Sequence, residues 1–205
     1  VFAETLKAAQ AYSAQKGAIF IPPYDNIDVV TGQGTVGLEI LDQVPDVKTI
    51  LVSIGGGGLA AGVAVAAKLK AAQQGRKIKV IGVQSQNAAS YVPSLKAGKE
   101  VEIKTSRTIA DGIAVAKPGH IPFELIAKHI DKVVTVSDDE IAKAIVVLLE
   151  RAKQVVEPAG AAAVAAIMSG AVKPKGKTVA VLSGGNIDPL LMQKIIGFGL
   201  TASER

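Results

Sequence analysis

The chain has 205 residues, and its content of 49% hydrophobic and 20% charged residues is typical of one soluble globular domain or one large lobe of a bigger fold. It contains no cysteine, which excludes disulfides, zinc–thiolate sites and thiol catalysis and fits a cytoplasmic protein. The lysines behind the formal charge of +5 are scattered along the sequence, and aromatic residues make up only 3%, so we expect no nucleic-acid partner. No apolar run reaches the length of a membrane span, so we expect no membrane partner either.

Hydrophobic patterning predicts that helices and strands alternate. A helical pattern covers residues 2–16, and a later helix follows Ser137, where an S-x-x-E sequence ending at Glu140 is typical of a capping box. Another helix is expected to begin at Pro158, because proline suits the first helical position. Short runs rich in Val and Ile, apolar on both faces, predict buried strands at 18–21, 49–54, 78–84, 132–136 and 178–182. This order predicts an α/β fold with a three-layer, mostly parallel twisted sheet and helices on both faces.

Two segments fit this alternation less directly. Residues 31–35 are expected to turn the chain and start a helix. The stretch 87–122 is the least regular of the sequence, and a loop of that length usually has a functional reason.

Four consecutive glycines, Gly55–Gly58, follow the strand expected at 49–54. No need of core packing calls for four residues without a Cβ in a row, and each glycine costs backbone entropy on folding. Such a loop can turn its amides toward one bulky anion, which the positive end of the following helix also attracts. A second glycine-rich turn, from Ser183 to Asn186, follows the strand expected at 178–182. Since ligands bind beyond the carboxyl ends of parallel strands, the two turns predict a phosphate site at that edge.

Three kinds of phosphate-binding loop can be compared with these glycines. A P-loop needs a lysine where this chain has Val63, so that interpretation fails. A dinucleotide-binding loop needs an acidic residue at the end of the next strand, where this chain has the neutral Gln84. The third kind holds a single phosphate on the loop amides, with the rest of the cofactor lying toward the second glycine turn. Pyridoxal phosphate has that shape.

Five motifs in order closely resemble those of the fold-type II pyridoxal-phosphate enzymes, and within them the threonine (serine) dehydratases. They are TGQGTVGLE at 31–39, GGGG at 55–58, IADG at 109–112, VEPAGA at 156–161 and LSGGN at 182–186. The segment IPPYD at 21–25 also looks like a dehydratase segment, and the resemblance covers nearly the whole chain. It implies the large cofactor-binding lobe of a tryptophan-synthase-β-like fold.

The resemblance also implies roles for individual residues. The cofactor phosphate would lie on backbone amides, with no cationic side chain required, namely those of Gly55, Gly56, Gly57, Gly58 and Leu59. Ser183 would hydrogen-bond the pyridine nitrogen, which a hydroxyl cannot hold protonated, and the resulting weaker electron sink suits β-elimination. Gly112 and Glu157 would lie near the ring, although Glu157 is equally a carboxylate favoured by the start of a helix. Asn186 is expected to shape its turn without touching the ligand.

One essential part of the family pattern does not occur here. The Schiff-base lysine lies in a Ser-x-Lys motif next to a loop that binds the substrate carboxylate, and no lysine of this chain lies in such a context. The chain begins at Val1 inside a helical pattern, as at a cut end. We therefore expect residues 1–205 to be most of the large pyridoxal-phosphate-binding lobe, without the small lobe that carries the lysine and without a C-terminal regulatory domain. Covalent catalysis by this cofactor needs that amine, so the chain alone should not turn over, and Glu157 is its only candidate catalytic residue.

A second departure from the pattern concerns metals. Relatives such as serine racemases bind a divalent metal through a Glu directly after the strand and an Asp six residues on. The matching residues here are Gln84 and Ser90, and a hard cation prefers carboxylate oxygens, so we expect no metal site.

The motif set and the missing carboxylates favour threonine ammonia-lyase. This is the pyridoxal-phosphate-dependent β-elimination and deamination of L-threonine, and less well of L-serine, to a 2-oxo acid and ammonia. The implied setting is a cytoplasmic homo-oligomer that acts on a small amino acid, in a route such as isoleucine biosynthesis. Serine racemase, threonine synthase, a cysteine synthase-like enzyme and a non-catalytic phosphate-binding module stay open as alternatives.

Overall fold

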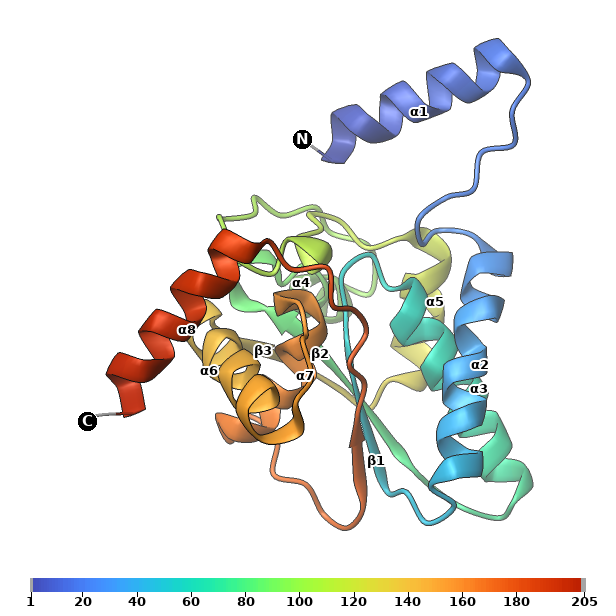
Figure 1. Cartoon of the computed structure of the whole chain (residues 1–205). Coiled ribbons are helices and arrows are strands. Elements are labelled where there is room, and N and C mark those ends of the chain that lie inside the picture. Colours follow the sequence, from blue (N-terminus) through green and yellow to red (C-terminus); the bar gives the residue numbers. More distant parts are fainter. Residues whose placement is uncertain (1, 204–205) are drawn as a thin grey trace.

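A computed structural model describes residues 2–203 of the chain. Its centre is a four-stranded sheet in the order β3-β2-β1-β4, and every neighbouring pair of strands is parallel. The strands are β1 (Thr49–Ser53), β2 (Lys79–Ser85), β3 (Lys132–Val136) and β4 (Thr178–Ala180). Because parallel strands run the same way, the turns that follow them gather at the carboxyl edge, at the top of Figure 1. The segments that precede them gather at the amino edge, at the bottom.

Helices cover both faces of the sheet (Figure 1). The first face carries α2 (Ile27–Gln43), α3 (Gly58–Gln73) and α5 (His120–His129). The second face carries α6 (Asp138–Val147) and α7 (Pro158–Met168), with α8 (Pro189–Ser203) packed on α6. The side chains of β1 alternate between the two cores, since Ile50 and Val52 belong to the first and Leu51 to the second. This arrangement confirms the predicted three-layer α/β fold.

The local signals at two helix starts are also confirmed. The Ser137 side chain accepts a hydrogen bond from the Glu140 N–H at 3.2 Å, and the Glu140 carboxylate accepts one from the Ser137 N–H at 2.7 Å. This capping box satisfies amides that have no partner within the first turn of α6. Helix α7 begins at Pro158, and its alanine-rich surface is buried against the sheet.

The segment expected to start a helix at 31–35 lies inside α2 instead, because Asn26 already caps that helix with its side chain. Gly37 on α2 and Gly62 on α3 lie where the two helices approach each other closely. A Cβ at Gly37 would lie 2.7 Å from the Val63 carbonyl oxygen, and a Cβ at Gly62 would lie 2.4 Å from the Val30 carbonyl oxygen. Glycine is therefore what lets α2 and α3 pack with their backbones in contact.

The strand expected at 18–21 is wrong. These residues pair with no strand of the described sheet, and Ile19 and Ile21 are 91% and 74% exposed. They belong to the extended connection between α2 and the separate helix α1 (Phe2–Lys16), which stands apart from the sheet in Figure 1. An apolar run makes a strand only where a sheet edge is within reach.

The irregular stretch that begins at residue 87 contains α4 (Tyr91–Ala97). The described chain also has three short helical turns. These are 3₁₀ turns at Gln86–Ala88 and Asp111–Ile113 and a π turn at Leu148–Ala152. No helix within residues 2–203 combines the length and the apolar character that crossing a membrane requires.

Candidate functional site

A cavity of about 340 Å³ lies at the carboxyl edge of the sheet, beyond the end of β1. All the residues for which the sequence predicted a role line it, namely Gly55, Gly56, Gly57, Gly58, Leu59, Gly112, Glu157 and Ser183. Asn186 does not line it, and its backbone N–H donates to the Glu157 carboxylate at 3.1 Å. Motifs more than 100 residues apart in sequence thus meet around one space.

The backbone amides of the glycine loop face no acceptor within the chain. Among the described residues, none of the six consecutive N–H groups from Gly55 to Ala60 donates a hydrogen bond. The first N–H of this run that does so is that of Ala61, which bonds the Gly57 carbonyl at 2.8 Å. Buried amides are almost always paired, and the first turn of α3 adds its positive dipole end. An anion of the size of a phosphate can accept hydrogen bonds from these amides and lies favourably at the positive end of the helix. The loop therefore fits the phosphate of pyridoxal phosphate.

The four glycines also have a packing role, which contradicts the expectation that core packing does not require them. A Cβ at Gly56 would lie 2.3 Å from Cγ of Tyr24, and a Cβ at Gly58 would lie 3.1 Å from the Tyr24 Cα. A Cβ at Gly57, where φ is +105°, would lie 2.1 Å from the Tyr91 hydroxyl. Tyr24 and Tyr91 therefore pack directly on the loop backbone, in space that a side chain on the loop would need.

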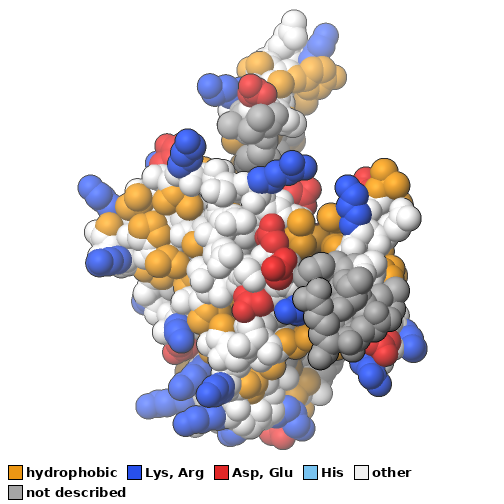
Figure 2. All heavy atoms as spheres, turned by 90° about the vertical axis from the view of Figure 1, so that its left-hand side faces the viewer, with side chains coloured by type: hydrophobic (Ala, Val, Ile, Leu, Met, Phe, Trp, Pro, Cys, Tyr) orange, Lys and Arg blue, Asp and Glu red, His pale blue; other side chains and the backbone are white. Residues whose placement is uncertain are grey.

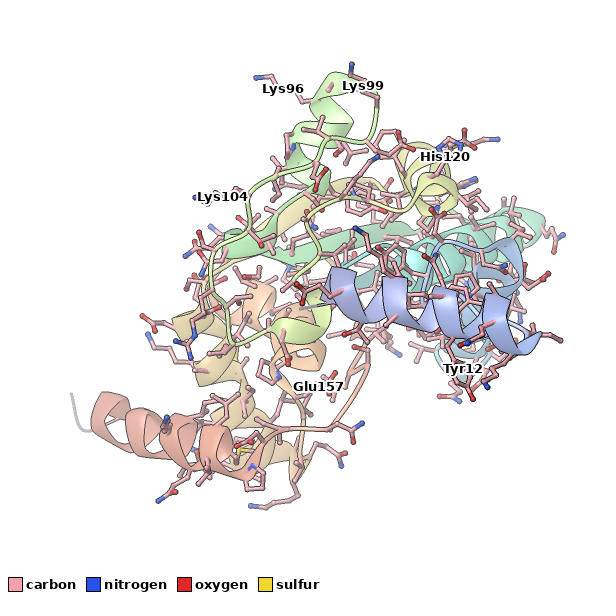
Figure 3. All side chains as sticks on the ribbon, turned by 90° about the horizontal axis from the view of Figure 1, so that it is seen from above. Tyr12, Lys96, Lys99, Lys104, His120 and Glu157 are labelled. Atoms are coloured by element: carbon pink, nitrogen blue, oxygen red, sulfur yellow. The ribbon has the colours of Figure 1, made fainter. Side chains whose placement is uncertain are left out.

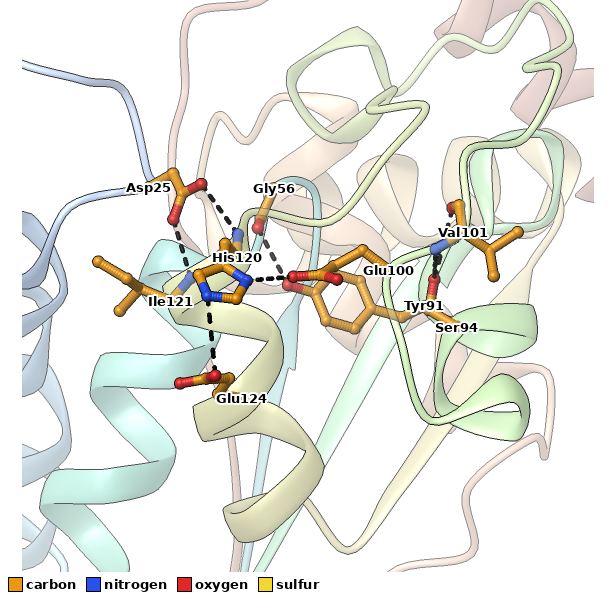
Figure 4. Close-up of polar contacts among 9 residues, drawn as sticks. All are labelled: Asp25, Gly56, Tyr91, Ser94, Glu100, Val101, His120, Ile121 and Glu124. Carbon is orange, nitrogen blue, oxygen red and sulfur yellow. Dashed lines mark hydrogen bonds and ion pairs between the residues drawn. The ribbon is translucent and has the colours of Figure 1, made fainter.

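The carbonyl of Gly56 shows how the loop is held (Figure 4). It accepts hydrogen bonds at 3.0 Å from the Tyr91 hydroxyl and at 3.0 Å from the Gly119 N–H. A trans peptide is planar, so the N–H of Gly57 must point away from both donors, and neither donor lines the cavity. Tyr91 is fully buried, and burial first, then the charge of Asp25, raises the pKa of its hydroxyl far above the ordinary value. The hydroxyl thus keeps the proton that it donates.

The start of α5 is fixed beside the loop by residues far away in sequence. The Asp25 carboxylate accepts hydrogen bonds at 2.9 Å from the backbone N–H groups of both His120 and Ile121 (Figure 4). The His120 ring bonds Glu100 at 2.5 Å through Nδ1. This hydrogen bond raises the pKa of His120 and lowers the pKa of Glu100.

The other end of the cavity is formed by the second glycine turn. Ser183 is exposed at the end of the β4 segment, where its hydroxyl can meet a ligand. The carboxylate of Glu157 lies against Gly184, where a Cβ would be 2.6 Å from Oε1. Glu157 occupies the N-cap position of α7 but makes no side-chain cap to that helix, and it bonds the turn at Asn186 instead. Figure 3 looks down on this edge and shows Glu157 near the middle of the molecule.

The charges around the cavity are unusual for an anion site. Among the described residues that line it there is no Lys, Arg or His, and Asp111 and Glu157 contribute carboxylates. Attraction for a phosphate must come from the loop amides and the α3 dipole. The lining also offers no amine that could bond an aldehyde.

At the positions that correspond to the metal site of the racemases, the structure shows a hydrogen-bonded amide. The Gln84 side chain donates to the carbonyls of Ile54 and Ala88 and accepts from the Tyr91 N–H at 2.9 Å. Gln84 thus helps to position the residue that holds the glycine loop. No group of three His, Asp or Glu residues within the described chain could hold a metal ion, and the absence of a metal stays a prediction.

The sequence analysis missed the residues that hold the glycine loop and the start of α5 in place. Tyr24 and Asp25 lie in a segment singled out only for its family likeness, and Tyr91 and Gly119 were assigned no role. A signal existed for Gly119, since a Pro-Gly pair is typical of a turn. None existed for Tyr91, because its contact with Gly56 joins residues 35 positions apart.

Comparison with known proteins agrees with this geometry. A model of the family described as "Pyridoxal-phosphate dependent enzyme" matches residues 1–184. The chain is 46% identical to the L-threonine ammonia-lyase of Thermotoga maritima, over 100% of this chain and 50% of that protein. Among solved structures it resembles the threonine deaminase of Solanum lycopersicum (processed form, isoform 2), with a TM-score of 0.84, 35% identity and coverage of 93% of this chain and 55% of the other. It also resembles maize serine racemase, with a TM-score of 0.84, 32% identity and coverage of 97% and 61%.

The chain spans about half the length of the curated relatives it matches first. The family match nevertheless covers the glycine loop, the second glycine turn as far as Gly184, and all the cavity-lining residues named above. The unpaired amides of the cavity and the family match therefore lead to the same conclusion: the chain belongs to the pyridoxal-phosphate dependent enzyme family.

Proposed function

We propose that the chain is the cofactor-binding lobe of a threonine ammonia-lyase, which converts L-threonine to 2-oxobutanoate and ammonia. The observation that carries this proposal is the run of six unpaired amides in a cavity without a cationic side chain, in a chain 46% identical to an L-threonine ammonia-lyase. Residues 1–205 would comprise most of that lobe, and the small lobe with its lysine would lie outside this chain.

In this proposal each end of the cavity holds one end of the cofactor. The amides of Gly55–Gly58 and Leu59 bind the phosphate, and the Ser183 hydroxyl meets the pyridine nitrogen. The cofactor, when bound, supplies an electron sink that acidifies the Cα–H of an attached amino acid. Because the Ser183 hydroxyl cannot hold the ring nitrogen protonated, the site favours a reaction in which the β-hydroxyl leaves with the electron pair. The balanced outcome is one 2-oxobutanoate and one ammonia for each L-threonine.

Glu157 and Gly112 define the space beside the ring. A Cβ at Gly112 would lie 3.0 Å from the Ala159 Cβ and 3.6 Å from Glu157 Oε1. Glycine therefore leaves this side of the cavity free of a side chain. The hydrogen bond from the Asn186 N–H holds the Glu157 carboxylate in place. We assign Glu157 the role of positioning the second glycine turn and of keeping a negative charge near the ring.

The amine that holds the cofactor covalently is not supplied by this cavity. No lysine lines it among the described residues, and the Ser-x-Lys sequence at 94–96 contributes nothing to its lining. We therefore propose that the 205-residue chain binds the cofactor without turnover. The complete enzyme would add the lysine from its small lobe.

Serine racemase is the strongest enzymatic alternative, because maize serine racemase has a closely similar structure. Gln84 argues against it, since its amide makes three hydrogen bonds where the racemase pattern places a metal-binding carboxylate. The remaining expectations, a cytoplasmic homo-oligomer and a place in isoleucine biosynthesis, form part of the proposal.

Two measurements test the proposal. In the first, the chain is titrated with pyridoxine phosphate and with pyridoxine, which share the ring but lack the aldehyde that would react with surface lysines. The phosphate form should bind far more tightly, and equal affinities would refute the phosphate site. In the second, the complete protein is given pyridoxal phosphate and L-threonine, and 2-oxobutanoate is measured. Formation of D-serine from L-serine at a higher rate would favour the racemase, and turnover by the 205 residues alone would refute the need for a lysine from outside the chain.

A further inference from the structure

A second cavity, larger than the one at the glycine loop, lies at the opposite end of the sheet. It has a volume of about 960 Å³ and opens at the amino edge, between the starts of β1 and β2, the end of α3 and the loop 172–176 before β4. Its lining shares no residue with the cavity at the carboxyl edge. The two spaces are therefore separate sites.

Cationic side chains surround this second cavity. Of its fifteen lining residues, seven are Lys or Arg and Asp131 is the sole acidic residue. They come from four segments: Lys48 before β1, Lys68 on α3, the group Arg76, Lys77 and Lys79 at the start of β2, and the pair Lys173 and Lys175 before β4. Figure 2 shows Lys and Arg side chains gathered toward the lower end of the face it displays, the end at which β1 begins in Figure 1.

These lysines are scattered in the sequence but not in space. The segments that precede parallel strands meet at one edge of the sheet, so residues 48, 79 and 173–175 become neighbours. The backbone confirms this closeness, because the Lys79 N–H donates to the Lys48 carbonyl at 2.9 Å and the Lys48 N–H donates to the Lys177 carbonyl at 2.8 Å. Residues that are scattered along the sequence therefore form a cluster at this edge.

Most of this positive charge is not neutralised within the chain. Lys68 pairs with Asp131 at 2.8 Å. Arg76 donates to the Val47 carbonyl at 2.9 Å and to the Gln74 amide oxygen at 3.1 Å, and its charge also acts on the Asp46 carboxylate, whose pKa it helps to lower. Within the described chain, the other lysines of the cavity form no ion pair, namely Lys48, Lys77, Lys79, Lys173 and Lys175.

The floor of the cavity is apolar. Ile78, Ile81 and Val172 contribute to it with exposures of only 6 to 8%. A floor of aliphatic side chains under a rim of cations matches a ligand that has a hydrophobic part and several negative charges. The volume lies in the usual range for small-molecule sites. No aromatic side chain lines the cavity, so the stacking surface of a single-stranded nucleic-acid site is not present there.

We propose that the amino-edge cavity binds a small organic anion that carries two or more phosphate charges next to an apolar group. Lysines act as point charges for phosphates, and the anchored Arg76 adds a planar donor group. The site is independent of the cofactor at the carboxyl edge.

The test uses calorimetric titration of the 205-residue chain with three probes: inorganic phosphate, inorganic pyrophosphate and naphthyl pyrophosphate. Pyrophosphate should bind with one site per chain and more tightly than phosphate, and the naphthyl group should add affinity through the apolar floor. The double variant Lys173→Glu/Lys175→Glu should weaken pyrophosphate binding by about tenfold or more, since each change reverses one charge at the rim.

A matched control separates this site from general surface charge. The double variant Lys96→Glu/Lys99→Glu makes the same change in net charge at the end of α4, which Figure 3 shows at the perimeter of the molecule. It should leave pyrophosphate binding within about twofold of the parent chain. Both variants change exposed lysines, and circular dichroism checks that each has the parent fold.

Three results would overturn the proposal. The first is an equal loss of pyrophosphate affinity in the two double variants, and the second is binding without a defined stoichiometry. The third is a single-stranded oligonucleotide that binds more tightly than naphthyl pyrophosphate and loses its affinity in Lys173→Glu/Lys175→Glu, which would point to a nucleic-acid surface. The affinity for pyridoxine phosphate should be the same in all three proteins, so failure of the cofactor site would be recognised separately.

Discussion

The two edges of the sheet offer two different ways to attract a phosphate. At the carboxyl edge, unpaired amides and a helix dipole face a cavity that lacks any Lys, Arg or His among its described lining residues. At the amino edge, cationic side chains surround a larger cavity. Amides are fixed by the backbone and give defined geometry, whereas lysines are mobile point charges that give attraction with little directional preference.

The two sites therefore depend on different properties of the chain. The carboxyl-edge site depends on close packing, because Tyr24, Tyr91 and Ile113 leave no room for a side chain at Gly55, Gly56 or Gly57. The amino-edge site depends on charge and on the apolar floor, and its lysines could be exchanged singly with small effects. Changes in packing, in salt, in a single hydroxyl and in pH should therefore affect the two edges differently.

Substitution Gly57→Ala should have the largest effect. The new Cβ would lie 2.1 Å from the Tyr91 hydroxyl and 2.8 Å from the Pro122 Cβ, at a φ of +105° that L residues rarely adopt. Overpacking and backbone strain together should lower the free energy of unfolding by about 3 kcal/mol. Pyridoxine phosphate affinity should fall more than about tenfold, because the loop must move. Urea unfolding and ligand titration measure both quantities.

The matched control is Gly32→Ala on α2, where a Cβ would meet nothing within 4 Å. It should raise the stability by about 0.5–1 kcal/mol, because alanine is the better helix former. An equal response of the two variants would show that the glycine loop is not under packing constraint.

The second-largest effect is expected from added salt, which should weaken binding at the amino edge more than at the carboxyl edge. Raising NaCl from about 0.05 M to about 0.5 M shortens the screening length severalfold, so pyrophosphate affinity at the amino edge should fall by about tenfold. The preference for pyridoxine phosphate over pyridoxine should change by less than about threefold, since the amides act at hydrogen-bond distance. Equal salt responses at both edges would show that the two sites attract phosphate in the same way.

Substitution Tyr91→Phe should have a smaller and more selective effect. It removes the hydroxyl that bonds the Gly56 carbonyl at 3.0 Å and leaves the Gly119 N–H as the other donor. One hydrogen bond contributes about 1 kcal/mol, so pyridoxine phosphate should bind about fivefold more weakly. Pyridoxine itself should bind as before, because only the phosphate contacts the loop.

Two further variants show whether Tyr91 acts through the phosphate. Tyr12→Phe, on the exposed helix α1, should change neither affinity (Figure 3). Ser183→Ala should weaken pyridoxine and its phosphate to the same extent. If Tyr91→Phe also weakened both ligands equally, its role would be general stability of the lobe.

The smallest effect is expected for His120→Asn, and it should depend on pH. The hydrogen bond with Glu100 raises the pKa of His120 above its unfolded value of 6.5 and lowers the pKa of Glu100 below its unfolded value of 4.5. The pair therefore stabilises the fold fully between these two values. Its contribution declines as pH rises through the raised pKa of His120 or falls through the lowered pKa of Glu100.

Thermal unfolding of the parent chain and of His120→Asn across that range checks this prediction. The difference between their midpoints should be greatest between the two unfolded pKa values and should shrink on either side. A difference that does not change with pH would show that the ring contributes through packing.

Much of the fold could be predicted from the sequence because its signals are local. The capping box at Ser137 and Glu140, the helix start at Pro158 and the strand at 132–136 depend on residues within a few positions of one another. The strand expected at 18–21 failed because pairing depends on a distant sheet edge, which propensity cannot show.

The candidate site divides in the same way. Residues at the ends of strands, such as Gly55–Gly58 and Ser183, could be found because strand ends converge in any parallel sheet. The residues that hold the loop could not, since Tyr24 and Tyr91 reach it through tertiary packing. The clustering of the amino-edge lysines could not be predicted for a related reason, because charges spread along a sequence can still meet where strands begin.

The most direct test of the account is the ratio of the dissociation constants of pyridoxine and pyridoxine phosphate for the 205-residue chain, measured in about 0.5 M NaCl. Each charge-assisted hydrogen bond to an amide contributes about 1.5–3 kcal/mol, so the phosphate form should bind at least about 100-fold more tightly. A ratio near unity would contradict the assignment of the glycine loop as the phosphate site.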